Sequence, residues 1–434
     1  MSRHPVLVPL VALLVVLIAG LGLIELALRL AAPTALVGVG WSGGEQGRRY
    51  GWGFDGGELT AVRDADSGVL YLNRANRRGW RDRDHDFAKP AGTFRVLLLG
   101  DSNIFGFVTP AEKTVGRQLE ERLNQAGIRA EVISLAYSAW GTDQEVEALE
   151  QEGMRYHPDA VVIHFCGNDL TDNLLWRQGG KFGERRPFYY DIGPDGAARR
   201  NANPGYKLSR AKLVQEFFFR HSEVVKRAYG GWKALLALRK GRFELTPGQV
   251  ALMRLWLGDR ASDAFADDLR RLKNPDEAMI AAVIHRHGLE DVAPDLLRMA
   301  ERVNAQEGDV GSMWRAEFGQ SDEQWRLFFA LARRAKALAE AGGARLLISS
   351  DYEDGRWNWD VDWHHVAATA EVKERYLRPN EILRRFTAEE GIRFVEPRHQ
   401  IIRTRNDAHP NIVGNDAIAR NILEALTEGT PAAR

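Results

Sequence analysis

Short apolar runs alternate with helix-start signals from Phe94 onward, and this alternation constrains the fold more than any other feature of the sequence. The apolar runs cover residues 94–99, 130–136, 160–166 and 344–350. Apolar runs of this length suit strands that are buried on both faces of a parallel sheet. Thr109, Thr142 and Ser321 each precede a Glu or Gln by three residues, which is the pattern of a capping box that opens a helix. We therefore expect the α/β class, with parallel βαβ units.

The patterning divides the chain into five stretches. A membrane anchor is expected first, then a linker with an irregular segment rich in Gly, Arg and Trp. The α/β domain follows in two parts, separated by a mainly helical insertion where the alternation stops after Asn173. The expected boundaries are 1–32, 33–90, 91–174, 175–318 and 319–428, in the order anchor, linker, first α/β part, insertion and second α/β part.

The N-terminus carries an uninterrupted apolar run from Val6 to Ile24, which Leu26 to Ala32 could extend. A cleavable signal peptide has an apolar core of about 7–15 residues followed by a small-residue cleavage site. This run is longer and no clean site follows it, so we favour an uncleaved membrane helix over residues 6–30. Arg3 precedes the run, and the positive-inside rule then keeps the short N-terminus in the cytoplasm. The expected location is the inner membrane, single-pass, with the remaining domain on the periplasmic side.

Charge and cysteine content exclude two classes of site. The 59 basic residues balance 59 acidic ones, so the net charge of zero offers no electrostatic argument for nucleic acid. Cys166 is the only cysteine, which excludes an internal disulfide and a multi-cysteine metal site.

Three polar motifs fall at or after the ends of predicted strands: Gly100–Asn103, Cys166–Asp169 and Asp407–Asn411. Loops at the carboxyl ends of parallel strands share one edge of the sheet, so the three motifs can converge. A serine nucleophile needs a base, and the base needs a carboxylate that orients it. An oxyanion needs hydrogen-bond donors, which the Ser102 N–H and the side-chain amide of Asn168 could supply. Ser102, His409 and Asp407 are therefore the candidate nucleophile, base and carboxylate.

At these residues the chain resembles SGNH/GDSL-type hydrolases, over residues 70–175 and 320–427. The resemblance implies a flavodoxin-like parallel sheet in a three-layer sandwich and a serine esterase without a metal or organic cofactor. It also implies that Asn168 serves the oxyanion hole. Arg78–Asp82, ahead of the first strand, resembles the lead-in of membrane-anchored bacterial members, which suggests a cell-envelope role.

Two positions leave alternatives open. The second family block reads N-x-G-x-x-G, and the same register here gives Ser134, Ala136 and Ala139. The second oxyanion N–H could come from Ala136, or from Ala139 or Gly141 if the loop is shifted. Many members place the carboxylate three residues before the histidine, and the residue at that position here is Asn406. If Asn406 holds the position in place of Asp407, the triad becomes a dyad of Ser102 and His409.

The expected activity is hydrolysis of an ester, of an acylated saccharide or a lipid, through an acyl-enzyme on Ser102. Trp359 and Trp363, in a tryptophan-rich loop after the fourth strand, are candidate substrate-binding residues. One alternative keeps the site and makes the protein an envelope polysaccharide O-acetyltransferase or deacetylase. An alternative of another class is a catalytically silent envelope-binding or scaffold protein.

Overall fold

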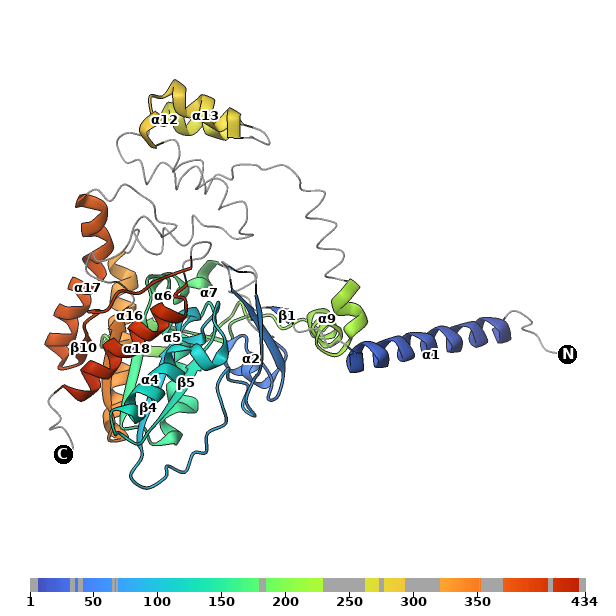
Figure 1. The fold of residues 1–434 in the computed structure, drawn as a ribbon, viewed down its shortest axis with the longest axis horizontal. Coiled ribbons are helices and arrows are strands. Elements are labelled where there is room, and N and C mark those ends of the chain that lie inside the picture. The colour runs from blue at the N-terminus through green and yellow to red at the C-terminus, as the bar shows by residue number, and fades with distance from the viewer. Residues whose placement is uncertain are drawn as a thin grey trace. The chain divides into compact units, whose positions relative to one another are not determined.

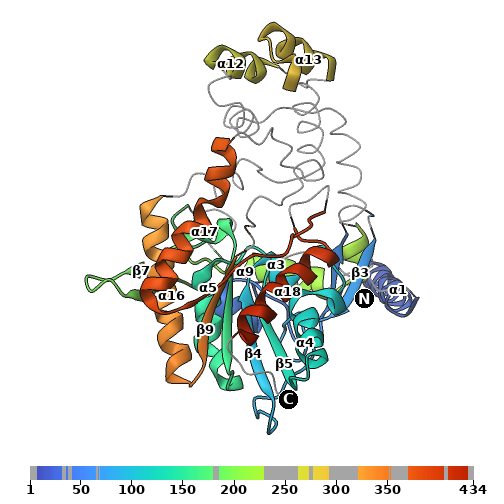
Figure 2. The same cartoon turned by 60° about the vertical axis from the view of Figure 1, so that its left-hand side comes forward.

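A computed structural model gives the fold (Figures 1 and 2), and the chain forms two compact units. The smaller unit comprises Met1–Leu36 and Leu208–Gly241, and the larger comprises Val37–Lys207 and Arg242–Arg434. The structure describes residues 7–31, 36–37, 42–64, 67, 69–178, 185–228, 262–272, 277–292, 321–350, 352, 370–404 and 409–428.

A five-stranded sheet forms the centre of the larger unit, with the order β10-β9-β6-β4-β5 and every neighbouring pair parallel. Numbered along the chain within this sheet, the order is 2-1-3-4-5, which is the flavodoxin-like topology. The expected fold class is thereby confirmed. The strands are β4 (Phe94–Gly100), β5 (Ala130–Ala136), β6 (Ala160–Phe165), β9 (Arg345–Ser350) and β10 (Arg393–Val395).

Helices cover both faces of this sheet. Crossovers between parallel strands are right-handed. The chain moves across the sheet in one direction from β4 through α4 to β5, and in the opposite direction from β5 through α5 to β6, so α4 and α5 lie on opposite faces. Helix α18 packs beside α4, while α16 packs beside both α5 and α17. These helices are α4 (Val115–Gln125), α5 (Thr142–Gln151), α16 (Asp322–Ala341), α17 (Ala370–Glu390) and α18 (Ile412–Thr427).

Of the three predicted capping boxes, the structure has the one at Ser321 and lacks the other two. The helix expected from Thr109 is replaced by the short η1 (Ala111–Lys113), and α4 begins only at Val115. The Ser321 side chain accepts from the Gln324 N–H at the start of α16, as expected. At α5 the cap is Gly141 rather than Thr142, and its own N–H donates to Gln144 Oε1. The one-residue shift follows from Gln144, whose side chain reaches back three residues to the backbone.

The expectation of a linker and irregular segment over residues 33–90 differs from what the structure shows. This stretch contains a helix and a three-stranded sheet of order β1-β2-β3. Tyr50, Trp52 and Trp80 are fully buried in the main core, where Tyr50 and Trp80 lie against Trp140. Because aromatic residues at irregular spacing carry this packing, hydrophobic periodicity gave no sign of it. The elements are β1 (Leu36–Val37), α2 (Glu45–Tyr50), β2 (Leu59–Arg63) and β3 (Leu70–Arg74).

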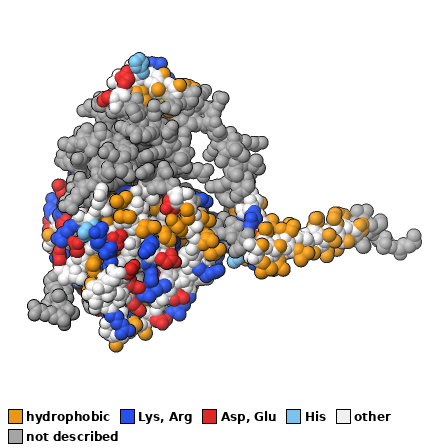
Figure 3. Space-filling view, viewed as in Figure 1, with side chains coloured by type: hydrophobic (Ala, Val, Ile, Leu, Met, Phe, Trp, Pro, Cys, Tyr) orange, Lys and Arg blue, Asp and Glu red, His pale blue; other side chains and the backbone are white. Residues whose placement is uncertain are grey.

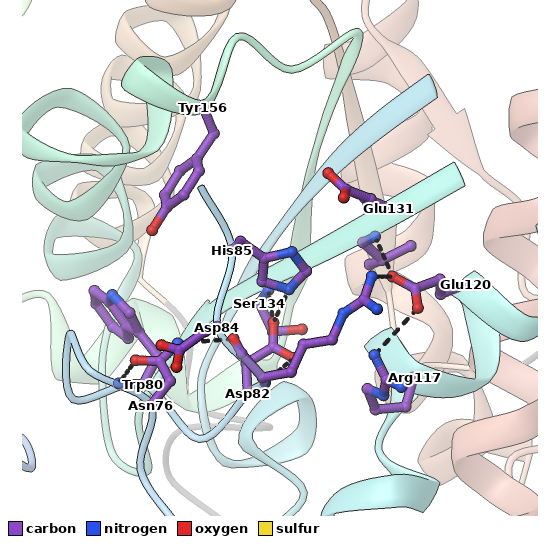
Figure 4. A network of polar contacts seen from close by, with 12 residues as sticks. Asn76, Trp80, Asp82, Asp84, His85, Arg117, Glu120, Glu131, Ser134 and Tyr156 are labelled. Carbon is purple, nitrogen blue, oxygen red and sulfur yellow. Dashed lines mark hydrogen bonds and ion pairs between the residues drawn. The ribbon is translucent and has the colours of Figure 1, made fainter. Parts of the chain in front are cut away.

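A polar network joins residues 76–86 to strand β5, which is an edge strand of the sheet (Figure 4). Asp82 Oδ2 accepts the Ser134 N–H at 2.9 Å and lies 3.3 Å from His85 Nε2. Glu120 Oε2 accepts from Arg83 at 2.6 Å and from the Val132 N–H at 2.9 Å. The network pairs backbone groups of β5 that would otherwise form an open sheet edge.

The expected insertion is less purely helical than its sequence suggests. It begins with α7 (Leu175–Gln178) and a hairpin of β7 (Phe188–Ile192) and β8 (Ala198–Ala202). The hairpin is fixed to α5, because Tyr190 and Arg200 both contact the Glu147 carboxylate, at 2.9 and 2.8 Å. The further elements described are α9 (Arg210–His221), α12 (Asp263–Arg271), α13 (Glu277–Arg286) and η4 (Glu290–Val292).

The N-terminal helix α1 (Leu7–Ala31) is apolar on all sides and almost wholly exposed. Its span from Pro9 to Ala31 is long and apolar enough to cross a membrane. Figure 3 shows hydrophobic side chains along its length. The smaller unit thus groups α1 with α9, which comes from the insertion about 180 residues later in the sequence.

Candidate active site

Ser102 lies directly after β4, the strand between β5 and β6, as the first residue of α3 (Ser102–Phe105). Asp101 caps this short helix, because its Oδ1 accepts the Asn103 N–H at 3.0 Å. A first helical residue has no intrahelical acceptor for its N–H, so the Ser102 N–H is placed to donate elsewhere. The side chain is 8% exposed and its Oγ donates to Asp101 Oδ2 at 3.2 Å. The serine is therefore held at the carboxyl edge of the sheet by its own helix cap.

The buried guanidinium of Arg81 supports the loop that carries Ser102. Its Nη1 donates to the Phe105 and Gly106 carbonyls at 2.6 and 3.1 Å, and its Nη2 donates to the Thr109 carbonyl at 2.7 Å. Burial lowers the pKa of Arg81 to about 10, so it remains charged at neutral pH. The sequence places Arg81 in the motif Arg78–Asp82, which resembles the family's lead-in segment. It gives no sign of these contacts, because the partners of Arg81 are 24 to 28 residues away.

The second loop carries the three candidate oxyanion donors. Ala136 ends β5 and pairs with Gly100 of β4, beside the serine loop. Ala139 has a left-handed backbone, with φ at 61°, in a turn closed by the Trp140 N–H on the Tyr137 carbonyl. The Gly141 N–H donates to Gln144 Oε1 at 3.4 Å and thereby belongs to the cap of α5.

Asn168 is the second residue of α6 (Gly167–Asp172), which follows β6. Its Nδ2 donates to Asp101 Oδ2 at 3.1 Å and to Asp172 Oδ2 at 2.9 Å. An amide nitrogen has two hydrogens, so both are engaged by carboxylates in this arrangement. Asp101 Oδ2 accepts from Ser102 as well, and this single carboxylate oxygen links two predicted site residues.

His409 approaches the serine loop through Phe107. The two rings lie with centroids 4.9 Å apart, and the Phe107 N–H donates to the Ser102 carbonyl at 3.1 Å. A backbone bridge between Arg403 and Pro410 shapes the segment before α18. The N-terminal turn of α18 is tied to the serine loop by Asn415, whose Nδ2 donates to Thr109 Oγ1 at 3.1 Å. The structure therefore brings Ser102, Asn168 and His409 to one edge of the sheet.

The other predicted site residues lie outside the described residues. These are Asp407 and its alternative Asn406, together with Trp359 and Trp363. The carboxylate partner of His409 and the tryptophan-rich loop stay predictions.

A group of carboxyl groups lies next to Asn168, and sequence reasoning missed it: Asp101, Glu145 and Asp169 are buried and Asp172 is half-buried. Burial, followed by the charge of Asp101, raises the pKa of Glu145 well above its usual range. Burial and then Glu145 do the same to the pKa of Asp169, and burial raises the pKa of Asp172 to about 7. Each acid looks like an ordinary helix-cap residue in the sequence; only the meeting of α5 and α6 groups them.

One buried cation faces this group. Arg186 pairs with Asp143, and both side chains are fully buried. Arg186 Nη1 donates to the backbone carbonyl of Asp172, at the end of α6. Among the described residues, no group of three or more His, Cys, Asp or Glu side chains is arranged to hold a metal ion.

The chain is similar to several solved structures. The crystal structure of TesA is 11% identical, covers 77% of this chain and 98% of its own, and has a TM-score of 0.33. A GDSL-like lipase from Bacteroides thetaiotaomicron is 11% identical, with coverages of 77% and 88% and a TM-score of 0.26. A carbohydrate esterase family 2 enzyme from Corynascus thermopiles is 10% identical, with coverages of 85% and 86% and a TM-score of 0.31.

No family model matches the chain, and no curated protein matches it. Its own topology and site geometry thus carry the assignment. By strand order, and by the meeting of Ser102, Asn168 and His409 at one edge of the sheet, the chain is a flavodoxin-like α/β protein with a serine-centred candidate active site.

Proposed function

We propose that this protein is a serine esterase of the SGNH/GDSL type. The observation that carries the proposal is the shared carboxylate oxygen of Asp101, which accepts from both Ser102 Oγ and Asn168 Nδ2. A nucleophile and an oxyanion donor within reach of one atom are placed to act on one carbonyl group. The position of His409 against Phe107 of the serine loop adds the base.

In the proposed reaction, Ser102 Oγ attacks the ester carbonyl while His409 takes the hydroxyl proton. His409 then delivers that proton to the leaving alcohol, and Asp407 orients the imidazole and stabilises its charged form. Water, activated by the same histidine, releases the acyl group from Ser102. All groups needed for these steps come from the chain itself.

The oxyanion is held by the Ser102 N–H, one backbone N–H of the second loop and the Asn168 amide. Because the Gly141 N–H already has an acceptor in Gln144, Ala136 or Ala139 is the better second donor. Asn168 must release one of its two carboxylate contacts to bind the oxyanion. The arrangement described is therefore a resting state in which both amide hydrogens are occupied.

A second candidate substrate is an envelope polysaccharide. Transfer of an acetyl group from Ser102 to a sugar hydroxyl would make the protein an O-acetyltransferase, and transfer of an acetyl group from the polysaccharide to water would make it a deacetylase. Trp176, in α7 just after α6, stacks on Tyr189 with ring centroids 3.7 Å apart, and such aromatic pairs offer faces for sugars. Transfer of the acyl group to added saccharide in preference to water would favour the acetyltransferase.

We further propose that α1 is an uncleaved inner-membrane anchor and that the larger unit lies in the periplasm. The contacts of Glu25 with residues 222–224 support retention of α1, because cleavage would remove one partner of a formed contact. A C-terminal alkaline phosphatase fusion should be active in intact cells. An inactive fusion would contradict the topology.

The test of the esterase uses the full chain in detergent, a fluorophosphonate probe and a short-chain aryl ester. Ser102→Ala should abolish labelling and reduce turnover by at least about a thousandfold. Ser350→Ala is the matched control, since Ser350 is a buried serine at the same sheet edge, on β9. Turnover that survives in Ser102→Ala would refute the nucleophile, and an unlabelled wild type would favour the silent envelope-binding protein.

A further inference from the structure

Helix α9 of the smaller unit exposes an apolar face. Val214, Phe217 and Phe218 are 55%, 56% and 51% exposed. Residues three and four apart lie on one side of a helix, so the three side chains form a single stripe. The Phe217 ring lies edge-on to Phe218 and to His221, with centroids 5.7 and 4.6 Å apart. A soluble surface rarely carries two adjacent exposed phenylalanines without a partner.

The opposite side of the same helix is covered. Glu216 is buried and Phe219 is half-buried, although Phe219 directly follows two exposed phenylalanines. The run of three phenylalanines is thus divided between two environments by helix geometry. The exposed stripe of Val214, Phe217 and Phe218 therefore lies on the side of the helix that faces away from its own protein, where it suits an apolar medium.

The end of α9 is attached to the apolar helix α1 through Glu25. The Glu25 carboxylate accepts from Ser222 Oγ at 2.9 Å and from the N–H groups of Glu223 and Val224 at 2.9 and 3.1 Å. It thereby caps the helical segment 223–228, which follows α9. Arg29 donates to Glu25 at 2.7 Å and also to the carbonyl of His221. The two charged residues of an otherwise apolar helix are explained by this contact.

The attachment fixes the depth of α9 relative to a membrane. Glu25 and Arg29 lie in the last two turns of α1, where a spanning helix leaves the hydrocarbon region. A segment bonded to these side chains lies at the boundary between headgroups and acyl chains. The polypeptide therefore returns to the level of its own anchor after passing through the first half of the larger unit.

The charge of this segment suits the same boundary. Residues 209–228 contain five basic and two acidic side chains, a net charge of +3 with His221 neutral. Burial, and then the charges of Arg220, Arg29 and Lys226, lower the pKa of His221, so it is neutral at pH 7. Basic residues beside exposed phenylalanines are the signature of a helix that lies in a membrane interface.

We propose that residues 209–228 form a membrane-interface element, which inserts Val214, Phe217 and Phe218 at the acyl boundary and binds anionic phospholipid headgroups through its basic side chains. The proposal rests on the membrane anchoring proposed for α1. It adds a second attachment to the bilayer, made by a segment of the insertion. The test would contradict the proposal if it showed that the larger unit, or a second copy of the chain, covers Val214, Phe217 and Phe218.

The test places a photoreactive benzoylphenylalanine at position 218 or 219 of the full chain. The protein is reconstituted in vesicles of phosphatidylcholine and phosphatidylglycerol, irradiated, and searched for lipid adducts by mass spectrometry. Position 219 is the matched control, with the same residue type, the same helix and the covered side. We expect lipid adducts at 218 in several-fold excess over 219, with a lower yield in vesicles of phosphatidylcholine alone.

Three results would overturn the proposal: protein adducts in place of lipid at 218, equal lipid yields at 218 and 219, or no adducts at 218. Alkaline carbonate extraction of the same vesicles tests α1 separately. A chain that resists extraction but lacks lipid adducts at 218 refutes the interface element and leaves the anchor intact. A chain that is extracted yet gives lipid adducts at 218 refutes the spanning helix and supports the interface element.

Discussion

At the scale of single residues, Ala139 adopts a backbone conformation that suits glycine. Its φ of 61° lies in the left-handed region, where a Cβ atom is crowded by the neighbouring carbonyl oxygen. The resembling family block has glycine at this position, and the alanine keeps the N–H while accepting the strain. The cost is therefore local to the turn that follows β5.

Ala139→Gly should stabilise the protein by up to about 1 kcal/mol, because relief of the left-handed strain exceeds the added freedom of the unfolded chain. The shift in the urea midpoint of the full chain in detergent measures this stabilisation. Ala136→Gly is the control, and its expected change in stability has the opposite sign. Ala136 ends a strand and lies outside the left-handed region, so glycine there should destabilise by about 0.5–1 kcal/mol. A destabilised Ala139→Gly would contradict the strain.

Asp172 should make stability depend on pH. Burial raises its pKa from 3.8 to about 7, so the folded protein keeps a proton on Asp172 that the unfolded chain has lost. Where the folded state binds more protons, stability falls as pH rises. The contribution is complete below about pH 4 and is lost as pH rises to about 7.

Asp172→Asn removes this ionisation and keeps an oxygen that accepts from Asn168. The variant should melt at a higher temperature than the wild type at pH 8 and close to it at pH 5. Thermal unfolding at both pH values checks this expectation. An equal difference in melting temperature at the two pH values would count against the raised pKa.

At the scale of elements, the stretch of residues 76–86 is a support for the serine loop and for the edge strand β5. Arg81 satisfies three carbonyl groups of the serine loop, and Asp82 satisfies a backbone N–H of β5. Neighbouring side chains in an irregular segment thus complete the hydrogen bonding of two regular elements. The segment acts as part of the α/β domain.

Arg81→Met should destabilise the protein by about 2–4 kcal/mol, because it leaves buried carbonyl oxygens without a donor. Arg83→Met, two residues along, is the matched control. Arg83 forms a half-exposed ion pair with Glu120, so its loss should cost about 1 kcal/mol or less. Denaturant unfolding of both variants gives the comparison, and equal losses would show that the three carbonyl contacts are unimportant.

The elements that the sequence predicted are those with local signals. Strands β4, β5, β6 and β9 are mainly apolar runs, and Ser321 marks the start of α16 within four residues of sequence. The β7–β8 hairpin was missed because its strands mix aromatic and charged residues and are fixed by Glu147, some 40 to 50 residues away. Local patterns reveal elements, whereas partners distant in sequence decide how irregular segments pack.

The same distinction between local signals and distant partners applies to the candidate active site. The motifs of Ser102, Asn168 and His409 could be placed at one edge because parallel strands share their carboxyl ends. The shared contact of Ser102 and Asn168 with Asp101, and the carboxyl groups around it, could not be foreseen. They depend on side-chain directions at the meeting of α3, α5 and α6, which no spacing in the sequence encodes.

At the scale of the whole molecule, each of the two compact units is made of two separate stretches of sequence. The polypeptide leaves the smaller unit after Leu36, returns to it at Leu208 and leaves again after Gly241. The two units are thus joined by three crossings of the chain. No cut in the sequence separates them cleanly.

The cap that Glu25 provides has a consequence for producing the protein. A chain begun at residue 34, the natural choice for removing an apolar helix, also removes the carboxylate that closes the segment after α9. Such a shortened chain keeps Phe217 and Phe218 exposed and should self-associate in buffer without detergent. Light scattering after gel filtration will show this, and changing both phenylalanines to serine should restore a monodisperse species. A catalytic preparation free of lipid therefore needs that double change together with the truncation.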